Sequence, residues 1–326
     1  MSIQNDFELL TEKAVEEIEK KIESLLPEEP ESLYEPLRYI HEAGGKRLRP
    51  VLTYLASRST DGADWLAAGT AVELLHTFTL IHDDIMDNAN TRRGARTLHQ
   101  KYDLSTAILA GDVLIALATQ ALADGKYENP NAMLSEFANG FRYVCEGQAL
   151  DKEYENSATV SPAAYFHMID LKSARMLELA AVMGAHVAGD NYIEELREFA
   201  HNIGIAFQVR DDLLDLTADE ASFGKTIGGD ILEGKRTYMF VMAMDRFTEM
   251  AEEDQMLLRK VQGGYARLND VPKVKDLFRR VGILDDAEKE ILHYTRKGQE
   301  ALASLPNGSF KDGLMLFSNY LLGREL

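Results

Sequence analysis

The sequence predicts an all-α fold, and three observations support this prediction. Helix-forming residues dominate the chain of 326 residues from end to end. No regular alternation of strand and helix patterns, short repeat or low-complexity segment interrupts them. Apolar residues between Leu66 and Asp87 recur at spacings of three and four, which puts them on one helical stripe. That stripe consists of Ala71, Leu74, Leu75, Phe78, Ile81 and Ile85. We therefore expect a single domain over residues 1–326, built from roughly a dozen helices.

Turn-forming segments separate the expected helices. They are LPEEPESLYEP near residue 30, GGKRLRP at residues 44–50, YENPNA near residue 130, SATVSPA near residue 160 and FGKTIGGDILEGK at residues 223–235. Proline is favoured as the first residue of a helix, so Pro50 is expected to begin the helix PVLTYLASR. Pro162 follows Ser161, a residue type that caps helix starts, so a helix is also expected from Pro162.

The composition disfavours several classes of protein. Asp and Glu total 54 against 35 Lys and Arg, and the net charge of −19 argues against nucleic acid or an anionic membrane as the main partner. The single cysteine, Cys145, excludes an intramolecular disulfide and a cysteine-rich zinc site. The first residues lack the basic-then-apolar order of a signal peptide, so a cytoplasmic protein is expected.

The longest apolar stretch, from Ser105 to Ala123, approaches the length of a membrane span. Asp112 lies near its middle, where a charge costs about 2.5–3.5 kcal/mol on insertion scales. A core helix is therefore expected here, and no transmembrane segment is predicted.

Two copies of an Asp-Asp-x-x-Asp pattern carry the strongest chemical signal. The first belongs to HDDIMDNANTRRG, residues 82–94, at the C-terminal end of the long helix described above. The second belongs to QVRDDLLDL, residues 208–216. Neighbouring carboxylates repel one another, and each copy interrupts an apolar segment, so the carboxylates need partners. A single copy is more often a solvated acidic face, but a second copy weakens that interpretation.

The helical period decides which carboxylates share a face. At 100° per residue, the first and fifth positions of each pattern lie roughly 40° apart. The pairs that share a face are Asp83 with Asp87 and Asp211 with Asp215. Asp84 and Asp212 lie further round the helix circumference, away from these shared faces. If the two helices face each other across a cavity, their oxygens suit a hard divalent ion that keeps several waters and bridges to phosphate. Mg²⁺ fits that description best.

Positive residues near these patterns indicate an anionic ligand. They lie beside glycine or at expected helix ends, and they are Lys46, Arg47, Arg49, Arg92, Arg93, Lys172, Lys225 and Lys235. Arginine matches paired phosphate oxygens, and the free N–H groups of helix starts also bind phosphate. Together with two metal-binding patterns, these residues predict a polyphosphate site with enough anchors for two diphosphates.

Two segments imitate a nucleotide-binding phosphate loop without completing it. GDILEGKRT, from Gly229, has glycine and lysine at the required spacing, but Arg236 replaces the required Ser or Thr and no strand precedes it. SFGKTI has Gly-Lys-Thr at residues 224–226, but Asp219 occupies the position of the earlier glycine. A nucleotide triphosphatase is therefore not predicted.

The ordered set GGKRLRP, DDIMD with RRG, Lys-Ser, Q-x-x-DDLLD and GK…GGD…GK closely resembles the trans-isoprenyl diphosphate synthases, over about residues 41–240. The resemblance implies an isoprenoid synthase bundle, usually a homodimer, whose central cavity is walled by the two aspartate helices. It also implies a condensation in which about two or three Mg²⁺ ions draw diphosphate from an allylic substrate. The double bond of isopentenyl diphosphate then attacks the carbocation, and loss of a proton completes the step. Dimethylallyl, geranyl and farnesyl diphosphate would be the allylic substrates.

The resemblance also assigns residues to roles. The main metal ligands would be Asp83, Asp87 and Asp211, with Asp84, Asp212 and Asp215 as supporting or water-mediated partners. The allylic diphosphate would be held by Arg92, Lys172 and Lys225, with Lys235 nearby, and isopentenyl diphosphate by Lys46, Arg49, His76 and Arg93. Ser173, where many relatives have Thr, and Gln208 would shield the cationic carbon. His76 precedes Asp83 by seven residues and so lies on nearly the same face, whereas Glu73 is expected to be structural.

Product length is expected to depend on residues just before the first pattern. Thr79 and Phe78 precede Asp83 by four and five residues, which puts them about 6–7.5 Å deeper along the helix. The helical period alone puts Thr79 near the aspartate face and Phe78 off it. An aromatic residue followed by a small one at these positions resembles archaeal-type geranylgeranyl diphosphate synthases, which implies a C20 product stopped by Phe78. A C15 product, as from a farnesyl diphosphate synthase, is the alternative.

Two other functions compete with prenyl transfer. A class I terpene cyclase would share the aspartate helix and Mg²⁺ but would not need Lys46, Arg49 and Arg93. A regulatory subunit would keep the fold and accompany a catalytic synthase, but two intact patterns argue against it. The tail NYLLGREL offers Arg324 without the fuller basic ending of some relatives, which leaves closure of the site by the C-terminus open.

Overall fold

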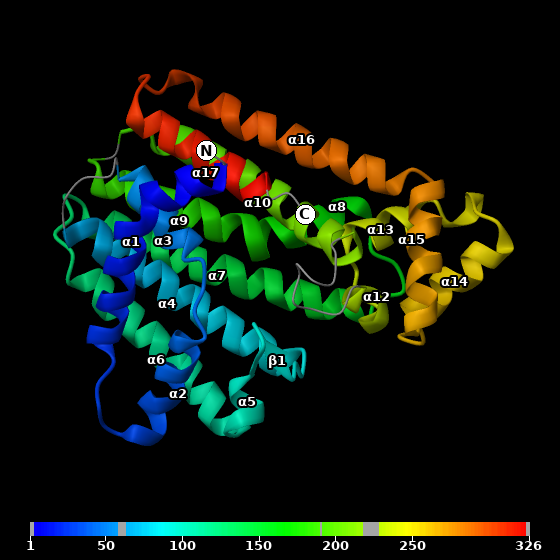
Figure 1. Cartoon of the computed structure of the whole chain (residues 1–326), viewed down its shortest axis with the longest axis horizontal. Helices are drawn as coiled ribbons and strands as arrows, with labels where there is room; N and C mark the ends of the chain where they lie inside the picture. The colour runs from blue at the N-terminus through cyan, green and yellow to red at the C-terminus, as the bar shows by residue number, and fades with distance from the viewer. Residues whose placement is uncertain (1–2, 58–62, 190, 218–227, 324–326) are drawn as a thin grey trace. The chain divides into compact units, whose positions relative to one another are not determined.

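The computed structural model describes residues 3–57, 63–189, 191–217 and 228–323. Most of them are helical (Figure 1), which confirms the predicted all-α fold. The chain divides into two compact units, and the expectation of one domain stays a prediction. The first unit comprises Met1–Arg142, Met176–Ala200 and Ala301–Tyr320, and the second comprises Tyr143–Arg175, His201–Glu300 and Leu321–Leu326. Lys225, Asp219 and Arg324 lie outside the described residues.

The first unit is built mainly from the N-terminal helices. Its complete elements are α1 (Ile3–Leu25), α2 (Glu31–Glu42), α3 (Leu48–Ala56), α4 (Ala63–Met86), β1 (Thr91–Arg92), β2 (Ala95–Arg96), α5 (Leu98–Lys101) and α6 (Leu104–Ala123). It also contains most of α9 (Arg175–Val187) and α17 (Ser309–Leu322), and the N-terminal parts of α7 (Pro130–Glu155) and α10 (Ile193–Thr217).

Close packing of α4 against α6 organises the core of the first unit. The two helices run side by side (Figure 1), and small residues on α6 permit the close approach. Its buried face includes Ala107, Ala110, Gly111, Ala118 and Ala121. A Cβ on Gly111 would lie 2.2 Å from Nε2 of His82, so any larger residue would collide with the ring that directly precedes the first aspartate pattern. This packing fixes the end of α4 that carries Asp83.

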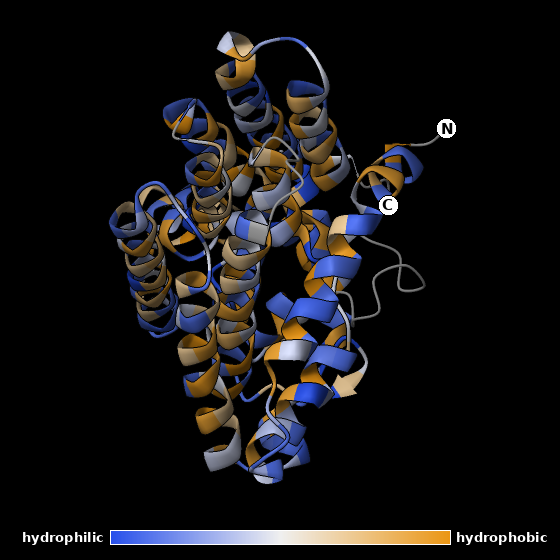
Figure 2. Cartoon of the chain, turned by 90° about the vertical axis from the view of Figure 1, so that its left-hand side faces the viewer, coloured by the Kyte–Doolittle hydropathy of each residue, from blue (hydrophilic) through white to orange (hydrophobic). Residues whose placement is uncertain are grey.

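The second unit is built from helices that surround the C-terminal halves of α7 and α10. Its remaining elements are α8 (Pro162–Ile169), the π-helix η1 (Asp170–Ala174), α12 (Gly229–Glu233), α13 (Tyr238–Asp245), η2 (Phe247–Glu249), α14 (Glu252–Gln262), η3 (Leu268–Asp270), α15 (Val271–Arg280) and α16 (Ile283–Ala301). The short helix η4 (Leu302–Ser304) follows α16 and belongs to the first unit. Its core includes Tyr165, Val209, Tyr238, Phe240 and Phe278. Figure 2 shows hydrophobic and hydrophilic residues on the same helices, as expected for helices that bury one face.

The helix boundaries follow the sequence predictions with one correction. The long helix that carries the first aspartate pattern is confirmed as α4. Pro162 begins α8, and the hydroxyl of Ser161 accepts a hydrogen bond from the N–H of Ala164 at 3.2 Å, as predicted. The prediction that Pro50 begins a helix is wrong, because α3 already begins at Leu48. Proline fits this third position too, since none of the first N–H groups of a helix has an intrahelical partner.

The hairpin of β1 and β2 was not predicted. Thr91 pairs with Arg96 and Arg92 with Ala95, so the turn consists of Arg93 and Gly94. Both turn residues have positive φ, 53° and 78°, as a two-residue hairpin turn requires. The sequence feature that could have predicted this turn is Gly94 directly after Arg92 and Arg93. The turn presents Arg93 on a short, sharply defined loop.

The apolar stretch from Ser105 to Ala123 lies within α6. Of the helices in the described ranges, α6 is the one that is long and apolar enough to span a membrane. Its small residues are buried against α4, which agrees with the expected core helix, but Leu104, Ile108 and Leu109 are 53, 40 and 57% exposed. The accessible surface of α6 therefore carries three apolar side chains together with the exposed Asp112.

Candidate active site

The first aspartate pattern lies in the last turn of α4 and just beyond it. Asp83 is half-buried and Asp87 is exposed, and the N–H of Asp87 donates to the carbonyl of Asp83 at 2.8 Å. Asp84 is only 1% exposed, and its Oδ1 accepts a hydrogen bond from Nε of Arg92 at 2.8 Å. Burial raises the pKa of Asp84, and the charge of Arg92 opposes this only in part. The pattern therefore presents Asp83 and Asp87 outward and uses Asp84 to hold Arg92.

The second aspartate pattern, on α10, has an exposed first residue and, like the first pattern, a buried second one. Asp211 is exposed, whereas Asp212 and Asp215 are 6 and 9% exposed. Oδ2 of Asp215 accepts the backbone N–H of Asp230 at 3.3 Å. The carbonyl of Asp215 accepts the N–H of Gly228 at 2.8 Å. These bonds tie the start of α12 to α10 within the second unit.

Asp230 is a candidate residue that the sequence analysis missed. Its backbone carbonyl accepts the N–H of Lys235 at 2.9 Å, and Nζ of Lys235 lies 3.8 Å from Oδ1. Burial, together with the charge of Asp230, raises the pKa of Asp212 to about 7. The available signal was an aspartate directly after two glycines and between two predicted phosphate-binding lysines.

Lys172 and Ser173 lie in η1, and two glycines let other helices approach its backbone closely. A Cβ on Gly147 of α7 would lie 2.4 Å from the backbone nitrogen of Lys172. A Cβ on Gly204 of α10 would lie 2.6 Å from Cα of Ala174. Neither contact can be relieved by a flexible side chain, so glycine is needed at both positions. Single π-helical turns within α-helices often occur at functional sites, and here the turn carries two predicted site residues.

A buried carboxylate holds the side chain of Lys172. Oδ2 of Asp151 lies 2.5 Å from Nζ of Lys172, and Asp151 is 5% exposed. Removing either member of such a pair leaves a buried charge without its partner. No distinct feature of the sequence marks Asp151, because α7 carries other acidic residues, such as Glu146 and Glu153. Asp151 therefore orients Lys172, which is predicted to bind diphosphate.

The structure brings together Ser173 and Gln208, the two residues predicted to shield a cationic carbon. Oγ of Ser173 donates to Oε1 of Gln208 at 2.6 Å. Nε2 of Gln208 donates to Oδ1 of Asp212 at 2.9 Å. The three side chains form one continuous chain of hydrogen bonds between η1 and α10.

The four predicted isopentenyl diphosphate residues all belong to the first unit: Lys46, Arg49, His76 and Arg93. Nη1 of Arg49 lies 2.9 Å from Nε2 of His76. Burial and the charges of Arg49 and Arg93 hold the pKa of His76 well below its usual value. The ring is therefore neutral and accepts the bond from Arg49. Burial lowers the pKa of Arg49 to about 10, so it remains charged at neutral pH, and Arg93 donates to the carbonyl of Gly44.

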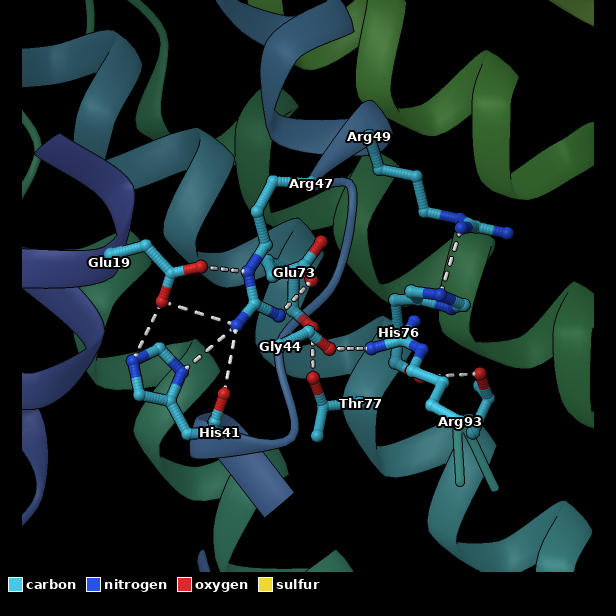
Figure 3. A network of polar contacts seen from close by, with 10 residues as sticks. Glu19, His41, Gly44, Arg47, Arg49, Glu73, His76, Thr77 and Arg93 are labelled. Atoms are coloured by element: carbon cyan, nitrogen blue, oxygen red, sulfur yellow. Dashed lines mark hydrogen bonds and ion pairs between the residues drawn. The ribbon is translucent and has the colours of Figure 1, made fainter. Parts of the chain in front are cut away.

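Arg47 occupies the centre of a network that supports the loop before α3 (Figure 3). It is 5% exposed, and its Nη1 donates to Oε1 of Glu73 at 2.8 Å. Nε and Nη2 donate to Glu19 at 2.5 and 3.2 Å, and Nη2 lies 3.2 Å from Nδ1 of His41. Burial would lower the pKa of Arg47, but the two carboxylates outweigh it and raise the pKa. Arg47 thus anchors the loop at residues 44–47 to α1, α2 and α4, and Glu73 serves this structural network.

The two residues predicted to control product length occupy different surroundings on α4. Phe78 is 9% exposed and packs edge-on against Phe141 of α7, with ring centroids 5.3 Å apart. It also contacts the ring of His82 at 4.4 Å between centroids. Thr79 is 8% exposed, and its hydroxyl donates to the carbonyl of His76 at 2.8 Å. Phe78 and Phe141 form an aromatic pair within the first unit.

The carboxylates suit a metal ion that other ligands help to bind. Among the residues that the structure describes, no three His, Cys, Asp or Glu side chains are grouped to hold a metal ion. Asp83 and Asp87 lie one turn apart, and Asp211 is exposed on the other pattern. Such oxygen donors fit a hard cation that keeps waters and takes phosphate oxygens as further ligands, as Mg²⁺ does. The predicted facing of the two patterns stays a prediction, since each belongs to a different unit.

Comparisons with known proteins agree with these observations. The polyprenyl synthetase family model matches residues 30–280. The geranylgeranyl diphosphate synthase of Methanosarcina mazei is 35% identical, over 94% of this chain and 95% of that protein. The geranylfarnesyl diphosphate synthase of Natronomonas pharaonis is also 35% identical, over 93% of each chain. The crystal structure of the geranylgeranyl pyrophosphate synthetase of Pyrococcus horikoshii has a TM-score of 0.91 and 36% identity over 99% of both chains. The chain therefore belongs to the polyprenyl synthetase family.

Proposed function

We propose that the chain is a short-chain trans-prenyltransferase that condenses isopentenyl diphosphate with allylic diphosphates to form geranylgeranyl diphosphate. The observation that carries this proposal is the pair of Asp-Asp-x-x-Asp patterns, each with a solvent-accessible first carboxylate, accompanied by two groups of cations. One group surrounds His76 in the first unit and the other includes Lys172 in the second unit. Two groups of cations suit a reaction with two diphosphate substrates.

The cations of the first unit suit the substrate that keeps its diphosphate. Arg49 and Arg93 carry charge beside a neutral His76, and Lys46 is exposed on the adjoining loop. A neutral imidazole does not compete with the arginines for the anion, and it orients the guanidinium of Arg49. These residues would hold the diphosphate of isopentenyl diphosphate.

The second unit suits the allylic substrate, whose diphosphate leaves. Lys172, oriented by Asp151, would neutralise charge on the departing diphosphate together with Lys235 and Lys225. Arg92, held by Asp84 in the first unit, is assigned to the same substrate. Mg²⁺, bound through Asp83, Asp87 and Asp211, would supply positive charge that stabilises the leaving group. Ser173 and Gln208 present oxygen atoms whose dipoles favour a neighbouring cationic carbon.

A single assay tests the function. The purified chain is incubated with labelled isopentenyl diphosphate, Mg²⁺ and dimethylallyl, geranyl or farnesyl diphosphate in turn, and the products are separated by chromatography. A C20 product supports the proposal, and a C15 end product would identify a farnesyl diphosphate synthase. A cyclic hydrocarbon made without isopentenyl diphosphate would identify a terpene cyclase. No product with any primer would fit a regulatory subunit.

Replacing Phe78 by alanine is expected to lengthen the products beyond C20. Phe78 lies on α4 and is buried against Phe141 of α7. Removing its ring therefore opens space beside the helix that carries the first pattern. Chromatography of the products measures the change. Thr79→Ser, which removes only one methyl group at the next position, serves as the control and should leave C20 dominant. An unchanged distribution for Phe78→Ala would exclude Phe78 as the stop for chain growth.

We also propose that the enzyme is a homodimer in the cytoplasm. The exposed apolar side chains of α6, Leu104, Ile108 and Leu109, suit contact with a second copy of the chain, and Leu134 of α7 adds a 50% exposed leucine within the same unit. Contiguous exposed apolar residues commonly mark protein interfaces. A single cysteine agrees with the reducing environment of the cytoplasm.

Ile108→Glu is expected to convert the dimer to a monomer, because the charged group would have to be desolvated in an apolar interface. Light scattering coupled to size-exclusion chromatography measures the mass in solution. Leu9→Glu is the matched control, since Leu9 is 74% exposed on α1, and it should remain dimeric. A dimer that persists in Ile108→Glu would exclude this face of α6 as the interface.

A further inference from the structure

Asp212 accepts hydrogen bonds from three protein donors. Its Oδ2 accepts hydrogen bonds from the hydroxyl of Tyr165 at 2.7 Å and from the backbone N–H of Tyr238 at 2.8 Å. Its Oδ1 accepts the bond from Nε2 of Gln208. The side chain is 6% exposed, whereas the preceding Asp211 is exposed. Both oxygens of Asp212 are therefore turned toward α8, α10 and the start of α13.

The chemistry of these groups fixes the direction of every bond in the chain. Gln208 turns its NH₂ group toward Asp212, and because an NH₂ group can only donate, Oδ1 of Asp212 is the acceptor. The amide oxygen of Gln208 then faces Ser173, whose hydroxyl must donate its hydrogen to it. All donated hydrogens point toward Asp212. The lone pairs of the Ser173 oxygen and the amide oxygen of Gln208 are thereby fixed at the η1 end of the chain.

We propose that Asp212 is a positioning residue that fixes the orientation of the Gln208 amide and the Ser173 hydroxyl through this hydrogen-bond chain, rather than a ligand of the metal ion. The proposal rests on the proposed function, because it assigns a purpose to oxygen dipoles beside Lys172. Dipoles that are already oriented stabilise a developing positive charge without reorganising during the reaction. Asp212 anchors these dipoles to the core through Tyr165, which is 1% exposed.

The consequence is a division of labour within the second pattern. Asp211 is exposed to solvent, and Asp212 points inward to the chain of hydrogen bonds. Replacing Asp212 by asparagine changes one acceptor into a donor at nearly constant volume. Gln208 would then have to turn its oxygen toward the new NH₂ group, and Ser173 would lose its acceptor.

The experiment compares Asp212→Asn, Asp211→Asn and Gln208→Leu in the full chain. Electron paramagnetic resonance measures Mn²⁺ binding in the presence of inorganic diphosphate, which requires no turnover, and steady-state kinetics with Mg²⁺ give kcat and KM. We expect Asp212→Asn to bind Mn²⁺ within about 3-fold of the unsubstituted chain and to lose about 10–100-fold in kcat, the range typical of residues that orient a ligand. Asp211→Asn should bind Mn²⁺ at least about 10-fold more weakly.

A double-variant cycle tests whether Asp212 acts through Gln208. In the Gln208→Leu background, adding Asp212→Asn should lower kcat by less than about a further 3-fold, because the chain of hydrogen bonds is already broken. Losses that multiply would overturn the proposal, as would Mn²⁺ binding weakened to the level of Asp211→Asn. If Asp212→Asn does not fold, Tyr165→Phe takes its place in the cycle, since it removes one donor to the carboxylate. A chain that binds Mn²⁺ and diphosphate but forms no product with any primer would contradict the proposed function instead.

Discussion

Replacing Glu73 by leucine is expected to lower the free energy of unfolding by about 3 kcal/mol and the melting temperature by roughly 4 °C. Glu73 is 3% exposed and accepts a hydrogen bond from Nη1 of Arg47, so the substitution leaves a buried guanidinium with fewer partners. Loss of one partner of a buried ion pair costs about 3–5 kcal/mol, and the lower end applies because Glu19 still neutralises Arg47. Thermal and urea unfolding followed by circular dichroism measure the change.

A second variant separates the effect of the buried Arg47 charge on stability from the effect of lost packing. Arg47→Met combined with Glu73→Leu leaves neither charge of this pair buried, so it should regain most of the lost stability. Glu12→Leu, at an exposed position of α1, is the control and should change stability by less than about 0.5 kcal/mol. A Glu73→Leu variant as stable as the unsubstituted chain would show that the network contributes nothing. Glu73→Leu alone should also raise KM for isopentenyl diphosphate, because Arg47 anchors the loop that carries Lys46.

Local patterns in the sequence were sufficient for the helices and for the aspartate patterns. The apolar stripe before Asp83 depends only on the helical period, so α4 and the aspartates at its end could be predicted. Ser161 and Pro162 similarly specify the start of α8 through their own chemistry. These features need no knowledge of the rest of the chain.

The partners of buried polar residues could not be predicted in this way. The helical period puts Asp84 and Asp212 away from the shared face, but their burial depends on Arg92 and Tyr165 from other segments. Lysine and arginine near a glycine-rich turn suggested phosphate binding for Arg47 too. The structure instead pairs Arg47 with Glu19, which lies 28 residues earlier in the chain. Contacts at such separations leave no periodic signal in a single sequence.

The hydrogen-bond chain of the second unit combines both cases. Gln208 precedes Asp212 by four residues, so their contact on one helix face follows from the period. Ser173 joins them only because η1 packs closely against α10 at Gly204, and nothing in the local sequence specifies a π-helix there. The sequence therefore identified these residues as site candidates without revealing how they are connected.

Asp211→Asn is expected to lower kcat by at least about 100-fold and to raise the Mg²⁺ concentration for half-maximal rate by at least about 10-fold. The amide keeps one oxygen donor but removes the negative charge that attracts the cation. Asp211 is exposed, so the substitution should leave the melting temperature unchanged. Initial rates at increasing Mg²⁺ concentration measure the effect. Asp285→Asn, at an exposed position of α16, is the control and should behave as the unsubstituted chain does.

The corresponding substitution in the first pattern tests whether the two patterns serve one reaction. Asp83→Asn should show the same loss and the same increased demand for Mg²⁺ as Asp211→Asn. Residues that act as a unit are not additive, so the double variant should lose far less than the product of the two single losses. Losses that multiply would indicate two independent metal sites. An unchanged demand for Mg²⁺ in both single variants would exclude these carboxylates as metal ligands, because removing a charged ligand must weaken binding of the cation.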